Sequence, residues 1–283
     1  MIDRYHLRYF LAVIDQGNFS RAADACNVSQ PTLSVGVAKL EKALGQALFR
    51  RTNRRVELTA AGVALAERAR RIESGFQDAE RAVAGTAAAS RVRLGVLTTL
   101  APARMDALLR DLVATVPAGG VEVVEGRERE LLDRLARGRI DAALTIVRGE
   151  GEVLLTEGYA VFVAASHPLA GRDAVEAGEL ADQPMIVRRH CELLAETSRH
   201  FTARGVRPFF AARTTGEERA LRYVRQGLGI TVAPEGHVEA GVARVRLTEF
   251  AHERRLGLVF AGHVDAAAMR AGAVALSVVR AMG

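Results

Sequence analysis

The sequence contains no tryptophan and only two cysteines among its 283 residues. These cysteines, Cys26 and Cys191, are far apart and form neither a metal-ligand motif nor a disulfide framework. No apolar run approaches the roughly 20 residues that cross a bilayer, and the first residues lack the hydrophobic core of a signal peptide. The sequence therefore excludes a disulfide-rich secreted domain and predicts a cytoplasmic protein without a membrane partner.

The motifs of the common enzyme classes are missing as well. There is no Gly-rich phosphate loop, no G-x-S-x-G elbow and no group of His, Cys, Asp and Glu at metal-ligand spacing. His190 precedes Cys191, but this pair alone is too little for nucleophilic catalysis. We therefore expect neither an enzyme nor a bound cofactor.

Basic charge is abundant, and nearly all of it is arginine. Lysine and arginine total 39 against 33 acidic residues, and Lys39 and Lys42 are the only lysines. The net charge of +6 permits binding to nucleic acids without showing it.

The stretch from Phe19 to Gly45 predicts two short helices joined by a tight turn. Ser20 and Ser29 are the expected N-caps, because a serine hydroxyl accepts a hydrogen bond from an unpaired first-turn amide. Pro31 suits the first turn of the second helix, in which apolar residues recur every three or four positions until Gly45. Small polar residues near the start of that helix are typical of a helix-turn-helix that reads the DNA major groove. A helix within residues 1–18 would complete a three-helix core.

Two short strands are expected next, at Leu48-Phe49 and Val56 to Leu58, on either side of an arginine-rich turn. A basic hairpin beside a helix-turn-helix is typical of a wing that grips phosphates or enters the minor groove. The alternative is a solvated basic loop. The predicted DNA-binding residues are Ser20, Arg21, Ser29, Gln30, Pro31, Thr32, Ser34 and Lys39 of the helices, and Arg50, Arg51, Arg54 and Arg55 of the wing.

A long helix is predicted from 59 to 89, with Thr59 as its cap. Its apolar residues alternate steps of four and three over about three heptads, which is typical of a helix that pairs with another helix. A helix packed on its own domain would usually show a wider apolar face. We therefore expect a dimer, which suits the reading of two DNA half-sites. The predicted dimer seam consists of Leu65, Ala69, Ile72, Phe76, Ala79 and Val83.

From Arg91 onward, short apolar strands alternate with amphipathic helices, which predicts α/β architecture with mainly parallel sheets. About 190 residues are many for one small domain, so two lobes with a cleft between them are expected. The predicted strands cover 92–97, 121–125, 140–146, 159–165, 184–188, 208–212, 229–233, 243–247 and 256–261. The predicted helices cover 102–116, 128–137, 192–204, 217–226 and 265–282.

Several runs of residues match one family in register. They are Leu7 to Val13, Asn18 to Ala23, Val28 to Ser34, Leu40 to Gly45, Leu48 to Arg51 and Leu58 to Gly62, followed by Leu94 to Val96, Leu135 to Gly138, Asp141 to Leu144, Ser166 to Leu169 and Gln226 to Ile230. On these runs, nearly the whole chain resembles a LysR-type transcriptional regulator. One departure is Gly36 inside the reading helix, which costs about 1 kcal/mol relative to alanine and is explained either by close backbone approach or by bending.

The resemblance implies an α/β fold with a winged helix-turn-helix, a long linker helix and a two-lobed effector domain similar to periplasmic solute-binding proteins. Family members are usually dimers of dimers that bind promoter DNA and respond to a small effector, and RNA polymerase is a further candidate partner. The implied domains are residues 1–60 for DNA binding, 61–89 for the linker and dimer helix, and 90–283 for the effector, with lobe I at 91–161 plus 262–283 and lobe II at 162–261.

In such two-lobed domains the ligand lies between the lobes, near strand ends and helix N-termini. Thr98 and Thr99 lie at the first strand-to-helix turn, where free amides and hydroxyls suit a carboxylate or another small anion. The alternative is that they only cap the helix. Arg127 and Arg148 follow the next strands and either add positive charge or are ordinary surface arginines.

Arg188, His190 and Cys191 would supply the other side of the cleft. In the peroxide-sensing branch of the family, a reactive cysteine follows a histidine at a similar place, and Thr99 aligns with a threonine near the peroxide. A thiol beside Arg and His at a helix N-terminus would have a lowered pKa and would oxidise easily. Against this, position 200 is His200 rather than a second cysteine, and a buried, inert cysteine is common.

The favoured function is therefore a DNA-binding regulator controlled by a small organic, anionic effector, with redox sensing through Cys191 as the alternative. An enzyme is disfavoured because the sequence contains none of the enzyme motifs named above. A non-specific architectural DNA protein would not need the α/β region.

Overall fold

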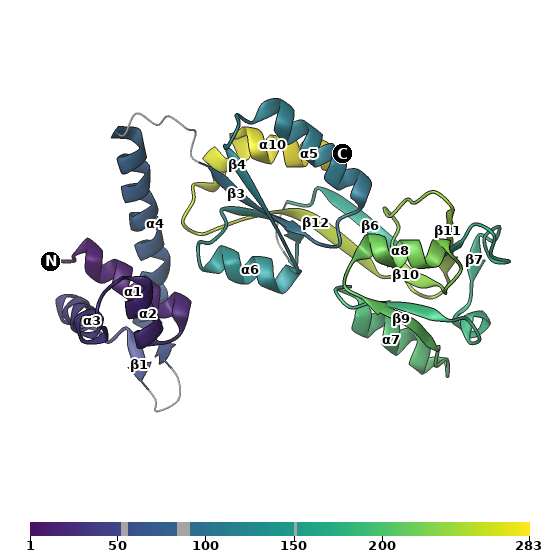
Figure 1. The fold of residues 1–283 in the computed structure, drawn as a ribbon, viewed down its shortest axis with the longest axis horizontal. Coiled ribbons are helices and arrows are strands. Elements are labelled where there is room, and N and C mark those ends of the chain that lie inside the picture. Colours follow the sequence, from purple (N-terminus) through teal and green to yellow (C-terminus); the bar gives the residue numbers. More distant parts are fainter. Residues whose placement is uncertain (52–55, 84–90, 150–151) are drawn as a thin grey trace. The chain divides into compact units, whose positions relative to one another are not determined.

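The computed structural model describes residues 1–51, 56–83, 91–149 and 152–283 (Figure 1). The chain forms two compact units. The first consists of Met1–Arg91, Arg134–Asp141 and Phe260–Ala266, and the second of Val92–Asp133, Ala142–Val259 and Ala267–Gly283. No helix among the described residues is both long and apolar enough to cross a membrane.

The first unit begins with a winged helix-turn-helix. Helix α1 contacts both α2 and α3, and the three enclose a core that contains Phe10, Leu33 and Leu40. Strands β1 and β2 pair antiparallel, with Phe49 opposite Leu58. The elements are α1 (Arg4–Gln16), α2 (Phe19–Ala25), α3 (Gln30–Leu44), β1 (Phe49–Arg51), β2 (Val56–Leu58) and α4 (Ala60–Val83).

The helix caps confirm most of the predicted boundaries in this unit. Ser29 accepts a hydrogen bond from the Thr32 amide, and Gly45 ends α3 in the left-handed conformation at φ 65°. The predicted cap at Ser20 is wrong, because α2 begins at Phe19, two residues earlier than expected. Asn18 caps it instead, and its side chain accepts from the Ser20 amide at 2.8 Å and the Arg21 amide at 3.2 Å. Asn18 lies directly before the helix in extended backbone, which is the geometry of an N-cap.

Gly36 in α3 is explained by the close approach of α1. A Cβ placed on Gly36 would lie 2.5 Å from Cδ2 of Tyr9 and 3.1 Å from Cδ2 of His6. Only a residue without a side chain lets the two helices approach so closely, so the cost of glycine in a helix is offset by packing.

Gly62, in the first turn of α4, has a tighter constraint, since a Cβ there would lie 2.2 Å from the backbone oxygen of Leu48. We expect Gly62→Ala to destabilise this unit by about 1–3 kcal/mol, because the backbone at Leu48 must move. Hydrogen exchange of the amides in α1 and α3 would measure the change in unfolding free energy.

Gly75→Ala on the same helix is the matched control, because no atom that the structure describes outside the helix's own turn lies within 4 Å of its added Cβ. It is expected to stabilise the unit by about 0.5–1 kcal/mol through helix propensity. Equal effects of the two substitutions would contradict the packing argument at Gly62.

The second unit is organised around an eight-stranded sheet. Its strand order is β4-β3-β5-β12-β6-β11-β7, and β10 also pairs with β6. The strands are β3 (Val92–Leu97), β4 (Val121–Gly126), β5 (Ala142–Ile146), β6 (Leu155–Ala164), β7 (Ala174–Val175), β10 (Thr231–Pro234), β11 (Val242–Leu247) and β12 (Glu253–Phe260), and a separate parallel pair is formed by β8 (Met185–Arg188) and β9 (Phe210–Thr214).

The expected parallel pairing holds for only part of the sheet. Strand β3 is parallel to β4 and β5, but β6 is antiparallel to β10, β11 and β12. The first half of β6 pairs with β12 and its second half with β10 and β11, so β6 belongs to both lobes of the unit. It therefore begins at Leu155, four residues before the predicted start, because it must cross from one lobe to the other.

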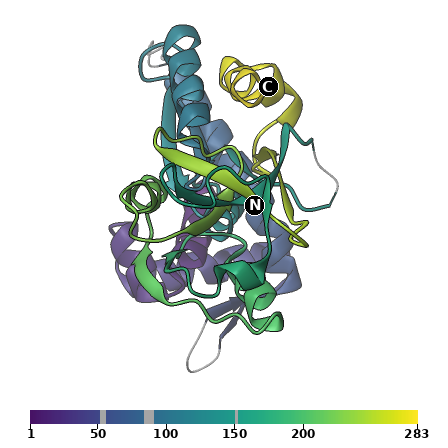
Figure 2. The ribbon, with the colours of Figure 1, turned by 90° about the vertical axis from the view of Figure 1, so that its right-hand side faces the viewer.

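Helices cover the strands of both lobes (Figure 1). Helix α5 packs against α10 in the first lobe, and α8 packs against β6 and β8 in the second. Figure 2 views the molecule from the side of the second lobe, with α8 seen nearly end-on. The helices are α5 (Pro102–Thr115), α6 (Glu128–Ala136), α7 (Leu194–Ala203), α8 (Glu217–Arg225), α9 (Ala266–Ala271) and α10 (Ala273–Met282), with a 3-10 turn η1 (Ala177–Leu180).

The other sequence predictions agree with these elements except at a few places. The single helix predicted at 265–282 is wrong, because Gly272 adopts extended backbone and separates α9 from α10. The short elements β7 and η1 were not predicted, since two to four residues carry too little periodicity.

Candidate functional site

The N-terminal part of α3 presents an exposed polar surface. Gln30, Pro31, Thr32 and Lys39 are exposed there, and Ser34 is half-buried. The hydroxyl of Ser29 is engaged with Oγ1 of Thr32 at 2.8 Å, so these two side chains also fix the start of the helix. Ser20 and Arg21 on α2 are exposed, and the Arg21 guanidinium donates to the backbone oxygen of Gln16 at 2.7 Å.

The wing is present as the β1–β2 pair, and Arg50 on it is exposed. Arg54 and Arg55 lie outside the described residues, as does the side chain of Arg51. Arg50 is therefore the wing residue whose exposure the structure supports.

The predicted dimer seam on α4 divides into two parts. Ala69 is fully buried and Leu65 is partly buried, and both pack in the core of their own helix-turn-helix. They are not available to a partner helix, because the start of α4 completes that core. Ile72, Phe76 and Ala79 are exposed, and the Arg4 guanidinium lies 4.5 Å from the Phe76 ring centre. The side chain of Val83 lies outside the described residues.

A buried arginine, Arg254 on β12, joins the two lobes of the second unit. Its guanidinium donates to Oγ1 and the backbone oxygen of Thr99, each at 2.9 Å. It also donates to Oε1 of Glu157 at 2.9 Å and to Oε1 of Glu192 at 2.5 Å. The Tyr159 hydroxyl donates to the same Glu192 oxygen at 2.7 Å. Thr99 is thus committed to an internal bond.

The charges in this cluster stabilise one another. Burial disfavours the charged form of Glu192, but the Arg254 guanidinium and hydrogen bonds outweigh it, so the pKa of Glu192 lies below its ordinary value. Burial raises the pKa of the Tyr159 hydroxyl, and the neighbouring Glu192 carboxylate adds to the effect. At neutral pH Tyr159 is therefore a hydrogen-bond donor to a carboxylate.

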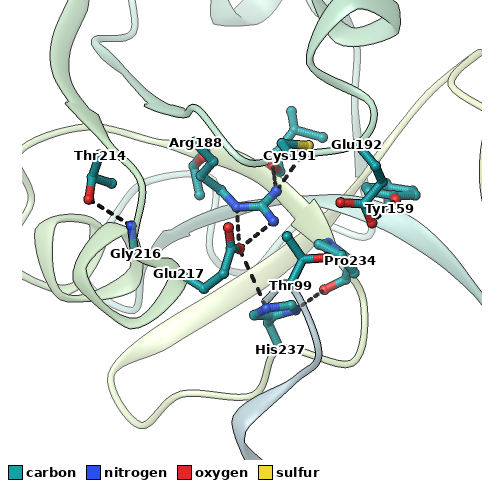
Figure 3. A network of polar contacts seen from close by, with 12 residues as sticks. Thr99, Tyr159, Arg188, Cys191, Glu192, Thr214, Gly216, Glu217, Pro234 and His237 are labelled. Atoms are coloured by element: carbon teal, nitrogen blue, oxygen red, sulfur yellow. Dashed lines mark hydrogen bonds and ion pairs between the residues drawn. The ribbon is translucent and has the colours of Figure 1, made fainter. Parts of the chain in front are cut away.

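A second buried arginine, Arg188, forms the centre of the cluster in Figure 3. Its Nε donates to Oε2 of Glu217 at 2.6 Å, and its Nη2 forms an ion pair with the same oxygen. Its Nη1 donates to the Val232 backbone oxygen at 2.8 Å and lies 3.4 Å from Sγ of Cys191. Arg188 is therefore held inside the protein by these contacts and is 3% exposed.

His237 lies beneath this pair, fully buried (Figure 3). Its Nδ1 donates to the Pro234 backbone oxygen at 3.2 Å, and its Nε2 lies 3.6 Å from Oε2 of Glu217. Burial, together with the positive charges of Arg188 and Arg254, lowers the pKa of His237 to about 3. The imidazole is neutral, with its proton on Nδ1.

The environment of Cys191 differs from the prediction of a lowered pKa. Burial raises the pKa of the thiol, and the nearby Arg188 guanidinium lowers it by less. The reason is that Glu217 already neutralises Arg188, and the thiol is half-buried. The resting group is a protonated thiol beside a fixed guanidinium.

The other predicted effector residues are in different places. Thr98 has a buried hydroxyl with no hydrogen-bond partner among the described residues, and it lines a cavity of about 550 Å³ together with His190, Glu217, Arg219 and Arg222. Arg127 and Arg148 are exposed and form ion pairs with Glu130 and Glu128 at 2.6 Å. The structure thus brings Thr98 and His190 together, and holds the other two arginines at the surface.

The sequence did not reveal Glu157, Glu192, Glu217, His237 or Arg254. Each is a charged or polar residue in a chain with 25% charged residues, and none belongs to a motif. The one available signal was that Arg254 stands two residues before the apolar run from Leu256 to Phe260, where a charged side chain needs a buried partner.

Comparison with known proteins identifies the family. Residues 5–63 match the model of the bacterial regulatory helix-turn-helix protein, lysR family, and residues 85–271 match the LysR substrate binding domain. The chain belongs to the LysR family. A LysR regulator is a DNA-binding transcriptional regulator and not an enzyme, and DNA is therefore a partner of this protein.

Individual relatives within the LysR family bear names that are more specific than the family description. The chain is 34% identical over 268 residues to a probable hydrogen peroxide-inducible genes activator of Mycobacterium avium, covering 90% of this chain and 86% of the relative. It is 29% identical to the dual regulator OxyR of Escherichia coli K12, covering 81% and 77%.

Solved LysR structures share the fold. A full-length OxyR variant from Pseudomonas aeruginosa has a TM-score of 0.63 at 23% identity, covering 98% of this chain and 95% of that one. Full-length CbnR in complex with its target DNA has a TM-score of 0.53 at 22% identity, covering 99% of each chain.

The reading helix and the wing of this LysR regulator are expected to act differently on DNA. Gln30→Ala should relax sequence selectivity by about 1–3 kcal/mol if the amide contacts a base edge. Arg50→Gln should weaken binding to every sequence and reduce the salt slope by about one. Gel-shift titrations with promoter DNA and random DNA, over a range of salt concentrations, would measure both effects. If both variants weakened binding to all sequences alike, the division into reader and wing would be wrong.

Proposed function

We propose that this protein is a thiol-based transcriptional regulator that responds to peroxide through Cys191. The observation that carries the proposal is the position of its sulfur, 3.4 Å from a buried guanidinium that is fixed by Glu217 and a backbone oxygen. Relatives at 34% and 29% identity that bear the name of hydrogen peroxide-inducible activators support it.

The reaction is a two-electron oxidation of sulfur. The thiol loses its proton, and the thiolate attacks one peroxide oxygen as the O–O bond breaks. The leaving hydroxide takes up a proton and departs as water, so the products are Cys191 sulfenic acid and water. Arg188 supplies a positive charge beside the developing thiolate and holds the sulfur in place.

The oxidised form has no second cysteine in its own unit. Cys26, the other cysteine of the chain, belongs to the first unit, and position 200 is a buried histidine. The sulfenic acid is therefore expected to be reduced or capped by a small thiol rather than closed into a disulfide within its domain.

Mass spectrometry with a sulfenic-acid trap would test the proposal. Cys191 should be labelled after treatment with hydrogen peroxide, and the oxidised protein should bind its upstream DNA differently in a gel shift. Cys26→Ser is the matched control and should respond as the wild type does, whereas Cys191→Ser should not respond. An unlabelled Cys191, or an unchanged gel shift after labelling, would contradict the proposal.

A small organic anion in the cavity beside Thr98 is the second candidate effector. The buried, unpartnered hydroxyl of Thr98 favours it, as do the N-termini of α5 and α8, which have no side-chain cap. Arg219 and Arg222 supply positive charge in a lining that also contains the carboxylates Asp106, Glu125, Glu217 and Glu218.

Calorimetric titration with small carboxylates would distinguish this candidate from the first. Saturable binding that is lost in Thr98→Val and kept in Cys191→Ser would support an anion effector. If no carboxylate bound to the protein and none changed its DNA binding, the anion effector would be contradicted.

We further propose that the protein acts in the cytoplasm as a homodimer, and as a dimer of dimers on DNA, with RNA polymerase as a further partner. The exposed Ile72, Phe76 and Ala79 of α4 support pairing through the second half of that helix.

Phe76→Glu should then shift the protein toward monomer in analytical ultracentrifugation, because a charge in the seam cannot be buried.

A further inference from the structure

A large apolar cavity lies between α7 and the β8–β9 pair. Its volume is about 930 Å³, and it is lined by the buried side chains of Met185, Ile186, Phe201 and Val206. It is a different cavity from the one beside Thr98, which has a polar lining of carboxylates and arginines.

Two neighbouring residues open onto the two different cavities. His190 lines the polar cavity, whereas Cys191 and Arg188 line the apolar one. A molecule that approaches the thiol from this side therefore passes along aliphatic and aromatic side chains.

The cavity is far larger than hydrogen peroxide requires. A molecule of about the size of water takes up roughly 30 Å³, whereas sites for organic ligands measure about 300–1,000 Å³ and are mostly apolar. The volume and lining next to Cys191 are those of a site for an organic molecule.

The lining also includes two exposed cations, Arg207 and Arg213. Neither forms an ion pair with a carboxylate of the described residues, and the Arg213 guanidinium lies 5.2 Å from the Phe210 ring centre. Glu192, the acidic side chain in the described lining, is already paired with Arg254. Positive charge on an apolar site is complementary to a ligand with an apolar chain and an anionic group.

We propose that this cavity binds an amphipathic organic hydroperoxide, with an apolar chain and a carboxylate, as an oxidant of Cys191. The apolar chain lies along Phe201 and Val206, the carboxylate pairs with Arg207 and Arg213, and the hydroperoxide group meets the sulfur. This inference rests on the proposed peroxide response and names the class of peroxide.

The chemistry balances as it does for hydrogen peroxide. The thiolate of Cys191 attacks the terminal oxygen of R–O–O–H, the O–O bond breaks, and two electrons pass from sulfur to oxygen. The leaving alkoxide takes up the proton that the thiol released. The products are Cys191 sulfenic acid and the alcohol R–OH.

Stopped-flow oxidation of the full-length protein would test the inference with three oxidants. These are linoleic acid hydroperoxide, its methyl ester and hydrogen peroxide, and Cys26→Ser serves as the parent so that only Cys191 reacts. The acid is expected to react at least about tenfold faster than hydrogen peroxide, because the chain is bound. The rate with the methyl ester should lie between these two rates, because the ester has the apolar chain but lacks the negative charge of the carboxylate.

The double variant Arg207→Gln/Arg213→Gln should lower the rate with the acid about tenfold and the rate with the ester much less. Arg199→Gln is the matched control, because Arg199 is an exposed arginine of the same region, paired with Glu196 and absent from the cavity lining. It should leave all three rates unchanged. Equal rates for the three oxidants in the parent would overturn the inference.

A binding measurement separates this inference from the proposed function. Dodecanoate has the chain and the charge but cannot oxidise a thiol, so its calorimetric titration reports the site alone. If no peroxide oxidises Cys191, the proposed function fails. Dodecanoate binding that is lost in the arginine double variant would then still support the cavity as a site for an amphipathic carboxylate.

Absence of dodecanoate binding to the parent overturns the inference. A change of oligomeric state in the double variant, without dodecanoate binding to the parent, would identify the cavity as an interface between copies of the chain.

Discussion

Arg254→Met is expected to destabilise the second unit by about 3–5 kcal/mol, because it leaves two buried carboxylates without their cation. Arg254 is 2% exposed, and its guanidinium joins Thr99 from the first lobe to Glu157 and Glu192. The two lobes are therefore expected to separate more readily. Urea unfolding followed by circular dichroism would measure the loss, and hydrogen exchange of the β12 and α7 amides would show where it occurs.

Arg280→Met is the control for this substitution. Arg280 forms an ion pair with Asp111 at the surface, and exposed pairs contribute only about 0–1 kcal/mol. A second test adds Glu157→Gln and Glu192→Gln to Arg254→Met, which removes the unpaired charges and should recover part of the stability. If Arg254→Met cost no more than Arg280→Met, the proposed role of Arg254 between the lobes would be wrong.

Acidification is expected to destabilise the protein through His237. The pKa of this buried histidine is about 3 in the folded protein, against 6.5 as its ordinary value. Below pH 6.5 the unfolded chain therefore takes up a proton that the folded chain does not accept. For each pH unit below 6.5, the free energy of unfolding then falls by about 1.4 kcal/mol. The full stabilisation by the neutral His237 is present only above pH 6.5.

Urea midpoints at pH 7, 5.5 and 4.5 would measure this dependence. His237→Gln keeps a side-chain donor for the Pro234 oxygen but cannot titrate, so it should lose roughly 2–3 kcal/mol of the pH dependence over this range. His252→Gln replaces an exposed histidine and is the matched control. A wild-type slope that persists in His237→Gln would contradict the assignment to His237.

The cluster around Arg188 connects the sulfur of Cys191 to a buried network of charges. Cys191 contacts the same guanidinium that Glu217 and Val232 hold, so a change at the sulfur alters a buried charge network rather than an isolated side chain. Buried ionic networks tolerate loss of a partner poorly, because the remaining charge has no water to replace it.

Much of the first unit could be predicted from the sequence, because its signals are local. Helix periodicity, the cap at Ser29, the stop at Gly45 and the short wing strands each depend on a few neighbouring residues. Part of the family resemblance rests on the same segment and the rest on runs between Leu94 and Ile230, and the resemblance implied the winged helix-turn-helix and the two-lobed α/β architecture. The strand-and-helix alternation likewise located most elements of the second unit.

Other features depended on contacts between residues far apart in the chain, and only the tertiary structure decided them. The heptad pattern could not tell Ala69, which completes the core of its own domain, from Phe76, which is exposed. The glycine at position 36 is explained only by the close approach of Tyr9, which lies on another helix.

The candidate site shows the same division most clearly. The sequence predicted that Cys191 follows His190 at the start of a helix, and it suggested a lowered thiol pKa from that local setting alone. In the structure the helix begins later, at Leu194, so Cys191 precedes its first turn. Burial raised the pKa instead, Glu217 neutralised Arg188, and Arg254 bound Thr99 from 155 residues away. Charge and desolvation act through space, so the ionisation of a side chain follows from its three-dimensional neighbours and not from its neighbours in sequence.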